Sequence, residues 1–144
     1  MRTLFSNPYF NASFWSWFTA QALKVILTLI KERKLDFYRF VGSGGMPSSH
    51  SAMVMGLSTA IGLKMGWDSL EYAVSIIFSL IIMYDASGVR RAVGKQAMIL
   101  NQMIKDRQQN KQIEEKQLKE LVGHTPIEVF AGAILGILIA NLLI

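Results

Sequence analysis

The C-terminal stretch 129–144 contains no charged side chain, and Asn141 is its one strongly polar residue. Three further apolar stretches occupy residues 14–30, 52–67 and 72–84. Each stretch is shorter than the roughly 20 residues that span a bilayer, although flanking polar residues can lengthen the helices. The pattern predicts an all-α, integral membrane helical bundle with about four transmembrane helices, built as a single domain over residues 1–144.

A soluble helical bundle is the alternative, and composition argues against it. Hydrophobic residues make up 51% of the chain and charged residues only 17%, whereas soluble domains carry about 25% charged residues. The aromatic N-terminal stretch 1–19 suits a membrane–water interface, and no signal-peptide cleavage is expected there. Because the chain has no cysteine, disulfides and thiolate chemistry are excluded.

Basic residues are concentrated in two of the connections between the apolar stretches. An even number of spans places connections 31–51 and 85–128 on one side of the membrane, and these hold 12 of the 15 basic residues. Cytoplasmic loops carry the excess of Lys and Arg. The charge distribution therefore predicts a multi-pass protein of the cell membrane with both connections in the cytoplasm and both termini outside.

Two further patterns concern helix packing. Apolar residues recur at helical spacing from Val93 to Ile104, between polar side chains, which predicts an amphipathic helix on the cytoplasmic side. This helix would pack on the bundle or lie at the membrane surface. Gly132 and Gly136 permit close helix approach, either within the fold or in a homodimer.

The two histidines, His50 and His124, each stand beside a helix-breaking element at the start of an apolar helix. A lone interfacial histidine is usually structural or solvated. Two of them on one basic face, at helix N-termini that present free N–H groups, favour a site for an anion such as phosphate. One histidine could then attack phosphorus while the other protonates the leaving oxygen.

Glu128 follows His124 by four residues, so its carboxylate could orient the imidazole from the same helix face. A second interpretation is purely structural, because Thr125 to Glu128 forms a capping box with Pro126 at the first helical position. The sequence leaves both interpretations open.

Basic side chains supply candidates for holding phosphoryl oxygens. Arg90 and Arg91 follow the third apolar stretch, with Asp85 and Lys95 nearby as supporting groups, although paired arginines at a membrane edge often only set topology. Lys24 lies inside the first apolar stretch, where it would face an interior anion or snorkel to the membrane edge. No metal is expected, because two histidines and scattered carboxylates lack a recognised ligand spacing.

Three blocks carry a family resemblance. They are Gly44–Ala52 (GGMPSSHSA), Met83–Arg91 (MYDASGVRR) and Leu121–Val129 (LVGHTPIEV). In that order they resemble the divergent branch of the type 2 phosphatidic acid phosphatase superfamily, which also contains vanadium-dependent haloperoxidases. The resemblance spans nearly the whole chain and implies a membrane lipid phosphatase that needs no cofactor.

The classical motifs of that superfamily are K-x6-R-P, P-S-G-H and S-R-x5-H-x3-D. By resemblance, Ser48 and the backbone of Ser49 bind phosphate and His50 is the general acid, with Ser49 in place of glycine. His124 corresponds to the nucleophile and Glu128 to its orienting aspartate. The third-motif arginine is missing from its usual place, where Arg90 or Arg91 could substitute for it. Lys24 and Lys31 keep the first motif's spacing, but a lysine stands for its arginine and no proline follows.

These observations predict a metal-independent phosphatase acting on a lipid phosphate monoester through a phosphohistidine. Its partners would be a membrane phospholipid and the bilayer, not nucleic acid. A cytoplasmic site favours phosphatidylglycerophosphate or phosphatidic acid. The alternatives are a non-catalytic lipid-phosphate binding or transport protein and a structural subunit of a membrane complex.

Overall fold

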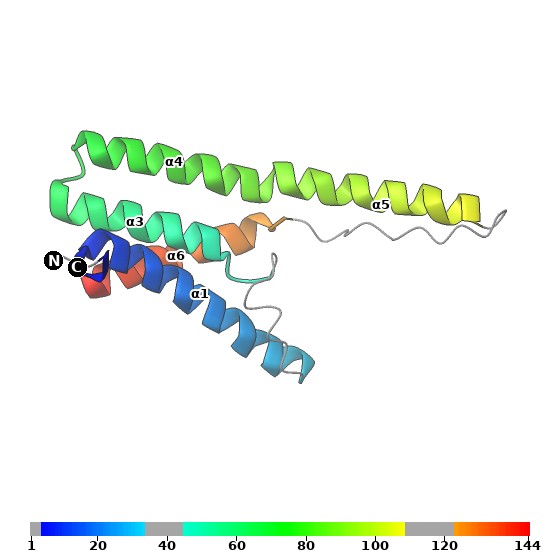
Figure 1. Cartoon of the computed structure of the whole chain (residues 1–144), viewed down its shortest axis with the longest axis horizontal. Coiled ribbons are helices and arrows are strands. Elements are labelled where there is room, and N and C mark those ends of the chain that lie inside the picture. Colours follow the sequence, from blue (N-terminus) through cyan, green and yellow to red (C-terminus); the bar gives the residue numbers. More distant parts are fainter. Residues whose placement is uncertain (1–3, 34–44, 109–122) are drawn as a thin grey trace.

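A computed structural model describes residues 4–33, 45–108 and 123–144 of the chain, and this part contains helices and no strand (Figure 1). The elements in order are η1 (Leu4–Ser6), α1 (Pro8–Glu32), α3 (Ser49–Met65), α4 (Leu70–Ser87), α5 (Val89–Gln108) and α6 (Pro126–Leu143). The prediction of an all-α membrane bundle is confirmed.

Helix α1 begins earlier than the residue 14 expected from the apolar stretch. The Asn7 side chain accepts hydrogen bonds from the backbone N–H groups of Tyr9 and Phe10, and Pro8 occupies the first turn. Both features favour a helix start, because proline has no N–H to leave unsatisfied there. Residues 8–13, which precede the apolar stretch, therefore belong to the start of the helix. At the other end, Arg33 closes α1 in the left-handed conformation (φ 51°).

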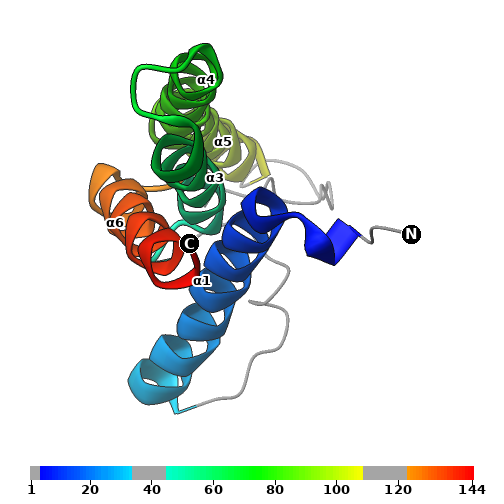
Figure 2. The same cartoon turned by 90° about the vertical axis from the view of Figure 1, so that its left-hand side faces the viewer.

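Helix α3 lies at the centre of the bundle and packs against α1, α4 and α6 (Figures 1 and 2). A Cβ added at Gly132 or Gly136 of α6 would clash with the backbone of α3, at the carbonyls of Ser48 and Ala52. Gly56 of α3 is equally close to α1. The small residues therefore bring three helices together within one chain. Of the two roles that the sequence left open for Gly132 and Gly136, helix packing within the fold is thus observed.

Three segments of the described chain are long and apolar enough to cross a membrane, namely Pro8–Ile30, Leu70–Lys105 and Pro126–Leu143. The fourth expected span, α3, forms a helix of only 17 residues. Its buried positions are small or hydroxylated side chains, which allow close packing of a central helix against several others.

Helices α4 and α5 run nearly in line, separated at Gly88, and α5 extends beyond the rest of the bundle (Figure 1). The helix predicted between Val93 and Ile104 is present. It does not pack on the bundle, since α4 is the one described element that α5 contacts.

The bundle has two distinct ends. Helix α1 begins and α6 ends at one of them (Figures 1 and 2). The opposite end brings together the start of α3, the end of α4 and the start of α6. Each of the three sequence blocks contributes to this second end.

Candidate active site

The start of α6 is built by interactions within one turn. Thr125 Oγ1 accepts a hydrogen bond from the Glu128 backbone N–H (3.4 Å), and Glu128 Oε2 accepts one from the Thr125 backbone N–H (2.9 Å). Pro126 takes the first helical position. The predicted capping box is therefore present, and it fixes the Glu128 carboxylate at the helix N-terminus.

The same carboxylate oxygen also contacts the histidine. Glu128 Oε2 lies 3.1 Å from His124 Nδ1, and the His124 side chain is only 5% exposed. The structural and functional interpretations of Glu128 are thus compatible, because one oxygen caps the helix and holds the imidazole. An ionised carboxylate can only accept, so Nδ1 is the donor in this contact, and in the neutral ring the lone pair would then be on Nε2.

Backbone hydrogen bonds join the start of α6 to the two neighbouring helices. The His124 N–H donates to the Ala86 carbonyl in the last turn of α4 (2.9 Å). The Glu128 carbonyl accepts from the N–H of Ser48, the residue that caps α3 (2.9 Å). These bonds set the position of His124 relative to α3 and α4 without any contribution from its side chain.

Serines form the start of α3. Ser48 Oγ accepts from the Ser51 N–H (3.4 Å) and from Ser51 Oγ (3.0 Å), so it caps the helix. Ser48, Ser49 and Ser51 are all buried. The chain enters this turn through Gly45, whose φ of +86° is easily adopted only by glycine, and through a cis peptide bond between Met46 and Pro47.

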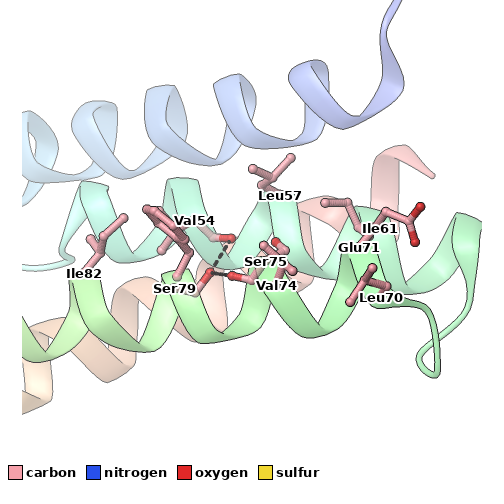
Figure 3. A pocket seen from close by; sticks show the side chains of 10 residues that line it. Val54, Leu57, Ile61, Leu70, Glu71, Val74, Ser75, Ser79 and Ile82 are labelled. Carbon is pink, nitrogen blue, oxygen red and sulfur yellow. Dashed lines mark hydrogen bonds between the residues drawn. The ribbon is translucent and has the colours of Figure 1, made fainter.

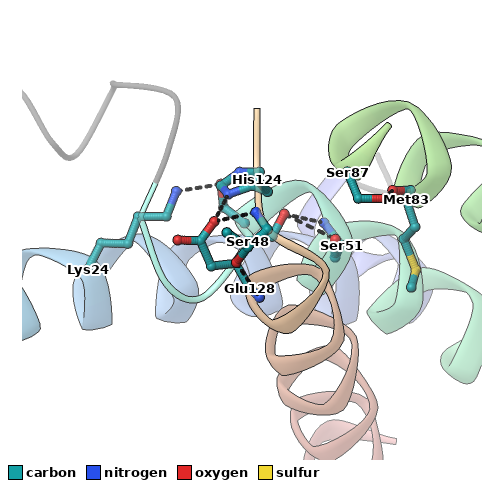
Figure 4. A network of polar contacts seen from close by, with 9 residues as sticks. Lys24, Ser48, Ser51, Met83, Ser87, His124 and Glu128 are labelled. Atoms are coloured by element: carbon teal, nitrogen blue, oxygen red, sulfur yellow. Dashed lines mark hydrogen bonds and ion pairs between the residues drawn. The ribbon is translucent and has the colours of Figure 1, made fainter. Parts of the chain in front are cut away.

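Lys24 of α1 points into this end of the bundle (Figure 4). It is 3% exposed, and its Nζ donates to Ser49 Oγ over 3.2 Å. The negative charge of Glu128 attracts it as well. Lys24 therefore does not snorkel to the membrane edge. A lysine buried in a membrane span is costly and normally faces an interior partner or anion.

The remaining candidates lie around this cluster. His50 stands on the exposed side of the first turn of α3. Arg90 and Arg91 belong to the first turn of α5, next to the end of α4 that binds His124, and their side chains lie outside the described part. Asp85 is half-buried in the last turn of α4, while Lys95 is exposed on α5 where that helix leaves the bundle.

The structure thus brings Lys24, Ser48, Ser49, His124 and Glu128 together from three helices that are distant in sequence. Two participants were not among the predicted site residues: Ser51, which holds Ser48, and Ala86, whose carbonyl holds His124. The spacing of Ser48 and Ser51 places them on one helix face and could have revealed the first. The contact made by the Ala86 carbonyl could not have been found in this way, because every residue has a backbone carbonyl.

This end of the bundle is suited to binding an anion. It combines a buried ammonium group with the N-termini of two helices, whose first N–H groups and dipoles favour negative charge. Within the described residues, no group of three or more acidic or histidine side chains is placed to hold a metal ion. An imidazole with a fixed tautomer beside an anion site is an arrangement that permits nucleophilic attack on phosphorus.

Comparisons with known proteins agree with the fold and the motifs. Residues 5–139 match the family model described as "Divergent PAP2 family". The chain is 45% identical over 135 residues to "Uncharacterized membrane protein YuiD" of Bacillus subtilis (strain 168), covering 86% of this chain and 85% of that one. No solved structure matches the chain. Since the family model covers nearly the whole length, this chain is a multi-pass membrane protein that belongs to the divergent PAP2 family.

Proposed function

We propose that the protein is a metal-independent phosphatase that hydrolyses a lipid phosphate monoester, with phosphatidylglycerophosphate and phosphatidic acid as the expected substrates. The observation that carries this proposal is the bond between His124 Nδ1 and Glu128 Oε2. It leaves Nε2 as the basic nitrogen of a buried imidazole, and the carboxylate stabilises the positive charge that this ring acquires during attack.

In the first step, His124 Nε2 forms a bond to phosphorus while the bond from phosphorus to the lipid alkoxide oxygen breaks. His50 donates a proton to that oxygen, so the lipid leaves as an alcohol. In the second step, water attacks the phosphohistidine, His50 accepts its proton, and inorganic phosphate leaves with His124 restored. No metal or redox partner is needed to balance either step.

Positive charge and hydrogen-bond donors would stabilise the phosphoryl oxygens as their charge redistributes. Lys24 and Ser49 are hydrogen-bonded to each other beside the start of α6, and both would contact these oxygens. Ser48 would contribute through the turn that it caps. Arg90 and Arg91, one helical turn beyond Ala86, would replace the arginine that the third motif lacks, with Asp85 and Lys95 supporting them.

We also propose that the site faces the cytoplasm, because the connections at that end carry most of the basic residues. The acyl chains would remain in the bilayer while the phosphate reaches the helix N-termini at the membrane edge. The second candidate function is lipid-phosphate binding or transport without turnover. A buried lysine with two helix N-termini supports that function as well, since an anion site alone does not require a nucleophile.

Phosphate release from the two lipids decides between these functions. The purified protein in detergent, with EDTA present, is compared with His124→Ala. We expect the substitution to lower kcat/KM at least about 10³-fold, since it removes the nucleophile. Thermal unfolding of both proteins checks that the variant is folded.

Three other outcomes would contradict the proposal. Lipid binding without release by the wild-type protein would establish the binding or transport function. Release that EDTA abolishes would require a metal and a different mechanism. Full activity in folded His124→Ala would remove His124 from the reaction.

A further inference from the structure

An apolar groove of about 540 Å³ runs between α3 and α4 on the side of the bundle (Figure 3). Residues Val54, Leu57 and Ile61 line it from α3, and Val74, Phe78 and Ile82 line it from α4. The mechanism proposed above does not use this groove.

The groove begins beside the candidate site. His50, Val54, Leu57 and Ile61 are spaced by four, three and four residues, so they form one stripe along α3. With a rise of 1.5 Å per residue, Val54 lies about 6 Å along the helix axis from His50. On α4, Ile82 precedes by one turn the Ala86 carbonyl that holds His124. Both walls of the groove therefore lead to the two histidines.

The interior of the groove presents hydrocarbon. Its serine hydroxyls are engaged with one another, since Ser58 Oγ lies 2.6 Å from Ser75 Oγ and 2.8 Å from Ser79 Oγ. Ser79 Oγ also lies 3.1 Å from the Val54 carbonyl and 2.9 Å from the Ser75 carbonyl, either of which can accept its single proton. Among the residues that the structure describes, Glu71 is the one charged residue that lines the groove, and it lies at the end away from the histidines. A polar occupant would find few partners here, whereas an apolar one would contact mainly hydrocarbon.

The dimensions of the groove limit what can fill it. From Ile82 to Leu70 it extends about 18 Å along α4, slightly more than half of a hydrocarbon core of about 30 Å. A single extended lipid chain that reaches through one leaflet matches this length.

We propose that this groove binds an acyl chain of the lipid whose phosphate lies at His124 and Lys24. The inference rests on the proposed function and makes it more specific, because the groove would favour substrates with a long acyl chain over short-chain or soluble phosphate esters. The bound chain enters at the His50 end, so it also positions the ester oxygen next to the proton donor.

A matched pair of substitutions on α4 tests the groove. Val74→Trp fills it, whereas Leu80→Trp adds the same indole at a position that does not line it. The two residues have similar exposed fractions of 53% and 57%. In lipid nanodiscs, we expect Val74→Trp to lower kcat/KM for dipalmitoyl phosphatidic acid about 10-fold. It should leave kcat/KM for the short-chain dihexanoyl analogue unchanged, and Leu80→Trp should change neither value.

Labelling separates failure of the groove from failure of the proposed function. A phosphatidic acid with a photoreactive diazirine at the end of one acyl chain is cross-linked to the protein, and the labelled residues are mapped by mass spectrometry. Labels concentrated at the lining residues of α3 and α4, and lost in Val74→Trp but not in Leu80→Trp, support the groove even if no phosphate is released.

Two results overturn the inference. One is labelling spread evenly over the groove and the lipid-facing residues outside it, with chain-length selectivity unchanged in Val74→Trp. The other is a change of oligomeric state in Val74→Trp without a change in selectivity, which would make the groove a contact between copies.

Discussion

The N-termini of α3 and α6 lie at the same end of the bundle, and each begins near a histidine. At α6, His124 is buried and its Nδ1 is held by Glu128, while its backbone N–H is held by α4. At α3, the serines point inward and His50 stays exposed. Both histidines therefore lie near a capped helix N-terminus, but one imidazole is buried and the other is exposed.

This difference matches the two roles in the proposed reaction. A nucleophile must meet phosphorus in a narrow range of geometry, which a buried ring with a fixed tautomer provides. A proton donor must regain its proton in each catalytic cycle, and contact with water makes this proton exchange simple. Within the proposed reaction, the burial of the two rings thus favours attack by His124 and proton transfer by His50.

After His124→Ala, the largest effect is expected for His50→Ala, which tests the proposed role of His50 through the leaving group. An alkoxide needs a proton to leave, whereas 4-nitrophenolate leaves readily without one. We expect kcat/KM to fall about 10³-fold for phosphatidic acid and about 10-fold or less for 4-nitrophenyl phosphate. Phosphate release from both substrates measures the difference. Equal losses on the two substrates would make His50 a phosphate-binding residue instead.

The next effect concerns Lys24, which joins the two helix starts because it bonds Ser49 and is attracted by Glu128. Lys24→Met keeps the length of the side chain and removes the charge. We expect kcat/KM to fall about 10²-fold, because one donor to the phosphoryl oxygens is lost. The thermal unfolding temperature should stay the same or rise, because burying a cation is costly. A large fall in that temperature with normal turnover of the remaining folded protein would make Lys24 a structural residue.

The two helix starts also differ in how far the sequence predicts them. The capping box at α6 involves residues within one turn, so Thr125, Pro126 and Glu128 could be identified from spacing alone. The start of α3 is completed by Lys24 and by the Glu128 carbonyl, which are remote in the sequence. Spacing carries no information on such contacts, and the motif resemblance supplied the residues without their geometry.

The helices themselves show the same limit. Apolar stretches predicted the bundle, but they missed the first turns of α1 because the cap at Asn7 and Pro8 lies in an aromatic segment. They also predicted that α3 is a membrane span like the others. They did not show that its small residues allow close packing against its neighbours. The alignment of α5 with α4 depends on how the chain continues through Gly88, which hydrophobic periodicity does not specify.

The smallest effect separates the two roles of Glu128 at the start of α6. In Glu128→Gln, the amide oxygen can replace Oε2 and accept from both the Thr125 N–H and His124 Nδ1, since turning the amide nitrogen toward them would lose the cap. Only the negative charge is removed, so we expect about a 10-fold fall in kcat/KM with stability retained.

Glu128→Ala loses both hydrogen bonds, and we expect about a 10²-fold fall in kcat/KM together with a loss of about 1 kcal/mol in the free energy of unfolding. Steady-state kinetics and thermal unfolding measure both variants. If Glu128→Ala lost stability while both variants kept full activity, Glu128 would be a helix cap alone, and the tautomer of His124 would depend on another group.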